Sequence, residues 1–165
     1  MKTLLLSSVV SLVLFGCGPH TLTQAEWAAM TTHTFPNRSV NEVLQAGAKV
    51  ADRNRANLSY TDTSMTVIRQ YDASPVLVGS IEYTLTAVAI NRRFIKTTLS
   101  VRSSEGGEVF LPPYKELYDM YFARMEYLLY NTKVWPTCDD NAYKNAAPYL
   151  RFALCNGTEN DIPVK

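Results

Sequence analysis

The chain has few of the side chains that carry out enzymatic chemistry. Its 165 residues include two histidines, His20 and His33, and three cysteines. The sequence contains no G-x-S-x-G motif, no glycine-rich phosphate loop and no His-x-x-x-His pair, so the usual nucleophile, phosphate and metal signatures are missing. Neither histidine is close in sequence to Cys138 or Cys155, which argues against a zinc site. We therefore predict a protein that is not an enzyme and holds no cofactor and no metal ion.

The chain also lacks an excess of charge of either sign and a long hydrophobic run. Lysine and arginine together number 16, against 15 acidic residues. Because nucleic-acid binding needs a basic stripe, we expect no nucleic-acid partner. The N-terminal apolar run, from Leu4 to Phe15, is much shorter than the roughly 20 residues that a helix needs to span a bilayer.

The N-terminus has the pattern of a secretory signal. Lys2 places a positive charge ahead of the short apolar run, as in exported proteins. The run ends in Leu14-Phe15-Gly16-Cys17, which resembles the lipobox of bacterial lipoproteins: an aliphatic residue, a variable one, a small one and cysteine. The resemblance implies that signal peptidase II removes residues 1–16 and that fatty acids such as palmitate are attached to Cys17. An uncleaved hydrophobic anchor or a buried N-terminal helix is the alternative.

The same resemblance implies a compartment. In the enterobacterial sorting rule, Asp after the lipidated cysteine retains a lipoprotein in the inner membrane, so Gly18 implies the outer membrane. We expect a lipid-anchored protein on its periplasmic side. In that oxidising setting, the two other cysteines, Cys138 and Cys155, are expected to form a disulfide. Closing this loop contributes roughly 3 kcal/mol in the chain-entropy model. Two buried free thiols are the alternative.

The helical signals stand at the two ends of the remaining chain. Residues 17–37 are expected to be a lipidated tether with a possible short helix at the capping box Thr23–Glu26. Next to it, Trp27 either docks on the domain or lies at the lipid interface. A second capping box, Ser39–Glu42, begins a helix with one apolar stripe. A wider stripe predicts a long helix over residues 114–131.

Strand signals fill the region between these helices. Apolar and polar residues alternate over 81–89 and again over 95–102, which predicts an antiparallel hairpin with one solvated face. Residues 60–71 have strand composition with ambiguous alternation. Residues 109–111 are expected to form a short fourth strand before Pro112 and Pro113.

This order of elements predicts an α+β fold. We expect a two-layer sandwich, in which an N-terminal helix and a long C-terminal helix cover one face of a three- to four-stranded antiparallel sheet. The domain is expected to occupy residues 38–135. Residues 136–165 are expected to form a disulfide-looped helical C-terminal segment.

Arg92 and Arg93, at the tip of the predicted hairpin, are candidate partner-binding residues. A basic tip suits anionic headgroups or an acidic protein, whereas an ordinary solvated turn is the alternative.

Together with the expected lipid anchor, the sequence favours a non-enzymatic outer-membrane lipoprotein that acts as a structural or assembly subunit by contacting another envelope protein. A small-molecule or lipid-binding periplasmic module with a cavity under the long helix is one alternative. An inhibitor or immunity lipoprotein acting through loop 102–113 is the other.

Overall fold

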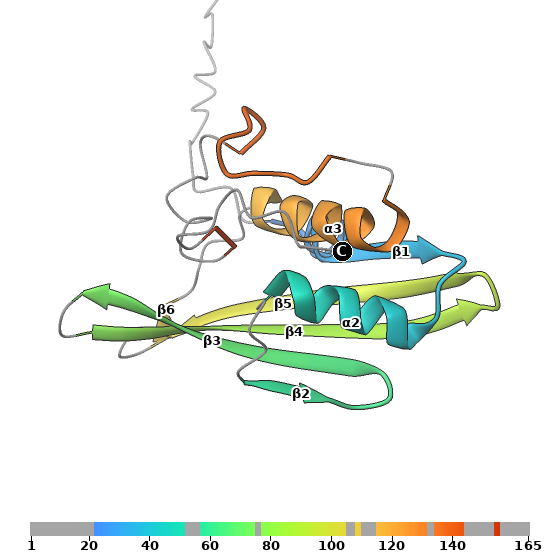
Figure 1. The fold of residues 1–165 in the computed structure, drawn as a ribbon, viewed down its shortest axis with the longest axis horizontal. Coiled ribbons are helices and arrows are strands. Elements are labelled where there is room, and N and C mark those ends of the chain that lie inside the picture. The colour runs from blue at the N-terminus through green and yellow to red at the C-terminus, as the bar shows by residue number, and fades with distance from the viewer. Residues whose placement is uncertain are drawn as a thin grey trace, which may run out of the picture.

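The computed structural model describes residues 22–51, 57–74, 77–104, 108–109, 115–131, 134–143 and 154–155. The predicted signal peptide, Cys17 and most of the helical turns expected in the C-terminal segment lie outside these residues. Within the described part, the α+β class is confirmed. An antiparallel sheet carries helices on one face, which gives the expected two layers (Figure 1).

Three long antiparallel strands form the centre of the sheet: β3 (Ser64–Ser74), β4 (Leu77–Asn91) and β5 (Phe94–Ser104). Three short strands extend it. Strand β2 (Leu58–Tyr60) pairs with β3, while β1 (Thr32–Pro36) and β6 (Glu108–Val109) both pair with β5. The predicted hairpin is confirmed as β4 and β5, with Leu85 opposite Leu99.

Two segments differ from the sequence prediction. Residues 32–36, expected to be tether, form the edge strand β1, because Phe35 is fully buried in the core and the strand pairs with β5. The single strand expected over 60–71 is divided between β2 and β3. The side-chain oxygen of Thr61 accepts a hydrogen bond from the backbone N–H of Ser64 (3.0 Å) and thereby closes the turn between them.

The helices are α1 (Gln24–Thr31), α2 (Val40–Ala51) and α3 (Lys115–Tyr130). Helices α1 and α2 begin at the two predicted capping boxes, and α3 corresponds to the long helix predicted over residues 114–131. Both capping boxes are present. At the second, the Ser39 backbone N–H donates to the Glu42 carboxylate (2.8 Å), and the Ser39 hydroxyl accepts from the Glu42 N–H (3.2 Å). Asn131 directly follows the last residue of α3, Tyr130, and has a left-handed backbone (φ 55°), which is a common conformation for the residue after a helix.

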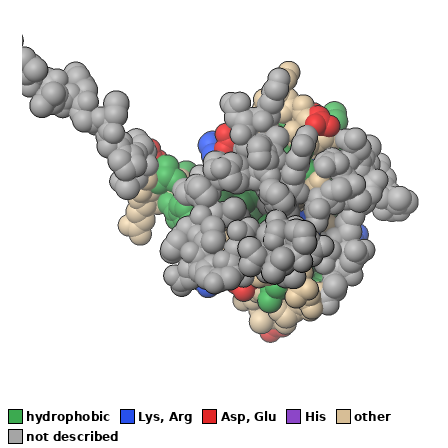
Figure 2. Space-filling model, turned by 90° about the vertical axis from the view of Figure 1, so that its left-hand side faces the viewer, with side chains coloured by type: hydrophobic (Ala, Val, Ile, Leu, Met, Phe, Trp, Pro, Cys, Tyr) green, Lys and Arg blue, Asp and Glu red, His purple; other side chains and the backbone are tan. Residues whose placement is uncertain are grey.

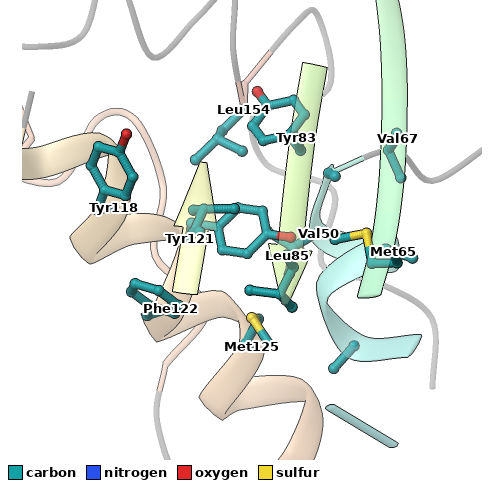
Figure 3. Close-up of a cluster of buried hydrophobic side chains, with 14 of the residues drawn as sticks. Val50, Met65, Val67, Tyr83, Leu85, Tyr118, Tyr121, Phe122, Met125 and Leu154 are labelled. Carbon is teal, nitrogen blue, oxygen red and sulfur yellow. The ribbon is translucent and has the colours of Figure 1, made fainter. Parts of the chain in front are cut away.

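The core is centred on one contact between α2, α3 and the sheet. The Tyr121 hydroxyl, on α3, donates a hydrogen bond to the Gly47 carbonyl of α2 (2.8 Å), and the Tyr121 ring stacks on Tyr83 of β4 (centroids 5.9 Å apart). Figure 3 shows Tyr121 in the middle of this cluster, with Leu85 and Met125 close by. A Cβ atom built on Gly47 would be 2.5 Å from Leu85 Cδ2. Glycine is therefore the residue that lets α2 lie this close to the sheet.

Replacing Gly47 by valine tests this close approach. We expect Gly47→Val to lower the free energy of unfolding by about 1–3 kcal/mol, because the added methyl groups overpack the core. Urea denaturation measures the change. The matched control is Gln45→Val on the exposed side of α2, which should change stability by about 0.5 kcal/mol or less. Equal effects of the two substitutions would contradict the packing described here.

Removing the Tyr121 hydroxyl tests the buried hydrogen bond. We expect Tyr121→Phe to lower the free energy of unfolding by about 1–2 kcal/mol at neutral pH, since the bond to Gly47 is lost. Burial also raises the pKa of Tyr121 well above its ordinary value of 10.0. The unfolded chain therefore loses this proton at a lower pH than the folded chain, and stability falls as pH rises above 10. Tyr121→Phe should show a shallower fall in alkaline denaturation series. Identical slopes for the two proteins would contradict this account.

Candidate functional site

A buried arginine attaches the C-terminal segment to α3. Arg124 is 3% exposed, and its guanidinium donates to the carbonyl of Pro136 (3.0 Å from Nε, 2.9 Å from Nη2) and to that of Leu154 (2.8 Å). The same group lies over the Trp135 ring, 4.6 Å from its centroid. Cation–π contact and charge-assisted hydrogen bonds are strong in such a desolvated place. Arg124 therefore joins two stretches that are far apart in sequence.

A disulfide ties the same two stretches to each other. Cys138 and Cys155 are bonded in the structure, with Cα atoms 6.3 Å apart, and both are buried. Cys155 Sγ lies 3.5 Å from Arg124 Nη2 and 3.9 Å from Met120 Sδ. Arg124 was not predicted from the sequence as a functional or structural residue, although a signal was present. It follows Tyr121 by three residues and precedes Leu128 by four, which places it inside the apolar arc of α3.

Substitution of Arg124 tests whether it holds this segment. We expect Arg124→Met to lower the free energy of unfolding by about 3 kcal/mol, because buried carbonyls lose charged donors. Chemical denaturation measures the change, with Lys49→Met on the exposed face of α2 as control. A loss no larger than that of the control would show that the segment is held in another way.

His33, expected in the tether, lies on β1 and reaches α3. Its Nε2 is 3.0 Å from a carboxylate oxygen of Glu126, and its ring stacks on Phe122 (centroids 5.1 Å apart). Tyr130 makes a similar connection, since its hydroxyl donates to the Pro36 carbonyl (2.8 Å). These contacts fasten the edge strand β1 to α3, so they have a structural explanation.

The candidate partner-binding residues Arg92 and Arg93 form the turn between β4 and β5. The Asn91 side-chain oxygen accepts hydrogen bonds from the N–H groups of Arg93 (2.8 Å) and Phe94 (3.1 Å), which closes the turn. The Arg93 carbonyl accepts another from the N–H of Asn37 (2.6 Å), just after β1. The turn is thus fixed by hydrogen bonds, and it lies at the end of the sheet, beyond α2 (Figure 1). Both arginine side chains are exposed.

Large exposed hydrophobic side chains lie next to this basic turn on β4 and β5. Val88 and Ile90 are each 59% exposed, and Phe94 is 41% exposed. Ala87 and Ile95, next to Val88 and Phe94, are buried, so Val88 and Phe94 lie on the outward phase of their strands. Ile90 lies where the register between β4 and β5 shifts, between Ala89 and Asn91. Lys96 is exposed and pairs across the strands with Val88. We call this surface the hairpin patch; it consists of Val88, Ile90, Arg92, Arg93, Phe94 and Lys96.

The hairpin patch combines three apolar side chains with three cations. Within the described residues, no ion pair neutralises Arg92, Arg93 or Lys96. A contiguous apolar group with a charged rim is typical of an interaction surface, whereas single exposed apolar residues are ordinary. The patch therefore has the chemistry of a contact surface for a partner that is apolar and acidic.

The basic half of the hairpin patch was predicted from the sequence, whereas its apolar half was not. The available signal was Val88 and Ile90, which stand on the strand phase that carries Glu82, Thr84 and Thr86. Phe94 comes next to these residues only through the pairing of β5 with β4, so the alternation pattern of a single strand could not predict it. Most of loop 102–113, assigned to the inhibitor alternative, lies outside the described residues.

Comparison with known proteins adds no assignment to this site. Neither the protein-family models nor the curated proteins searched include one that matches the chain. Among the residues that the structure describes, no helix has the length and apolar character to cross a bilayer. Over the same residues, no three His, Cys, Asp or Glu side chains gather in a way that would hold a metal ion.

Proposed function

We propose that the protein is a non-enzymatic bacterial lipoprotein, anchored by Cys17 on the periplasmic side of the outer membrane, and that it binds another envelope protein as a structural or assembly subunit. The hairpin patch carries the proposal. Its side chains are exposed, although the turn that carries them is fixed by hydrogen bonds that Asn91 Oδ1 accepts and one that the Asn37 N–H donates. A rigid exposed surface loses little conformational entropy when it binds.

The positive charge of the hairpin patch indicates which kind of partner surface fits it. Arg92, Arg93 and Lys96 have no ion-pair partner among the described residues, which favours a partner with carboxylates around an apolar patch that receives Ile90 and Phe94. The lipobox resemblance supports the compartment, because it supplies a membrane attachment for a chain with no membrane-spanning helix among its described residues. Tyr121 bonds Gly47 of α2 and stacks on Tyr83 of β4, and Leu85 and Met65 lie close to Gly47. This close packing of α2, α3 and the sheet favours a surface contact over a cavity for a ligand.

Site-specific photo-crosslinking in living cells tests the patch. A photoreactive amino acid at position 90 of the full-length protein should give an adduct with one envelope protein. The same amino acid at position 66, where Thr66 is on the outer sheet face away from the turn, should not. The double substitution Arg92→Glu, Arg93→Glu should abolish the adduct without lowering the melting temperature, because both side chains are exposed.

Charge reversal on the identified partner supplies the decisive control. Exchanging acidic residues at the crosslinked site for lysine should restore the adduct with the Arg92→Glu, Arg93→Glu variant. Equal crosslinking at positions 66 and 90, or an adduct that does not respond to these charges, would contradict the proposed contact.

A further inference from the structure

Helix α1 is unusual because almost none of it is covered by the domain. From Leu22 to Ala29 every residue is exposed, and only Met30 and Thr31 at its end are packed. Trp27 is 43% exposed and Leu22 is 38% exposed. In the view of Figure 2, hydrophobic side chains reach the surface at the left-hand edge of the molecule. Such a short helix derives little stability from its own hydrogen bonds.

The exposed stretch from Leu22 to Ala29 combines one charged residue with one large aromatic ring. Its single charged residue, Glu26, is engaged in the capping box with Thr23. The Trp27 ring meets Tyr118 of α3 edge-on (centroids 6.2 Å apart), which holds the indole at the surface of the domain. An indole with one side on protein and the other exposed suits the headgroup layer, where tryptophan is enriched.

Chain length places α1 beside the proposed anchor. Leu22 follows Cys17 by five residues, and five residues span at most roughly 18 Å when fully extended. Acyl chains on Cys17 would therefore keep Leu22, two residues before the start of α1, within this distance of the bilayer surface. We propose that α1 lies in the headgroup layer of the anchoring membrane, with Leu22 and Trp27 as its apolar contacts. This inference rests on the lipid anchor of the proposed function.

The contact would also orient the domain. Trp27 touches α3 near its start, at Tyr118, whereas Tyr130 at the end of α3 bonds Pro36, which pairs with Phe94 of the hairpin patch. Twelve helical residues separate these two points on α3, which is roughly 18 Å. The hairpin patch is therefore roughly 18 Å along α3 from the proposed membrane contact, which allows it to face the periplasm.

Tryptophan fluorescence tests this arrangement, because the chain has two tryptophans and the other, Trp135, is buried. The full-length lipidated protein is reconstituted in phosphatidylethanolamine–phosphatidylglycerol vesicles that contain lipids brominated on their acyl chains. We expect most of the Trp27 fluorescence to be quenched and its emission maximum to shift to shorter wavelength. Subtracting the spectrum of the Trp27→Phe variant from that of the unsubstituted protein isolates the Trp27 emission. Trp135, seen alone in Trp27→Phe, should not be quenched.

A second variant reports the orientation. In Trp27→Phe, Phe94→Trp, the indole of the hairpin patch should remain unquenched on the same vesicles. An unquenched Trp27 on vesicle-bound protein would overturn the inference and leave the lipid anchor standing. Quenching of position 94 as strong as that of Trp27 would overturn the orientation. Failure of the purified protein to associate with vesicles would overturn the lipid anchor, and the inference with it.

Discussion

The structure depends on how closely α2 approaches the sheet and α3. Gly47 permits that approach, and the Tyr121 hydroxyl uses it by donating to the Gly47 carbonyl while its ring stacks on Tyr83. One side chain thus links both helices and the central strand. Because the interior is closely packed, the position of α3 determines the positions of the segments that are attached to it. That includes the C-terminal segment through Arg124, and the edge strand β1 through Glu126 and Tyr130.

Regular elements could be predicted from the sequence because their signals are local. Capping boxes mark the starts of α1 and α2, and alternation marks β4 and β5. Strand β1 could not be predicted in this way, since five residues ending in proline have no clear period and become a strand only by pairing with β5. Arg124 was missed for a related reason: its carbonyl partners at Pro136 and Leu154 are 12 and 30 residues away in sequence.

The candidate site could likewise be predicted from the sequence only where its signal is local. Arg92 and Arg93 stand out as a basic pair between two alternating segments, so the turn could be found from the sequence. The apolar half of the hairpin patch depends on the register of two strands, because Val88 and Phe94 share a face only when β4 and β5 pair as they do. Residues 87–90 alternate between alanine and larger apolar side chains. This alternation tells the buried face from the exposed face only after the core is known.

The functional account joins three parts: a lipid anchor, an exposed α1 next to it, and a hairpin patch at the other end of α3. The anchor is the part on which the compartment, the membrane contact and the envelope partner all rest. Intact-mass spectrometry of the protein extracted from its native membrane tests it most directly. The account predicts a chain that begins at Cys17 and carries the added mass of its acyl groups. A bare thiol at Cys17, or a mature chain that retains residues 1–16, would contradict it.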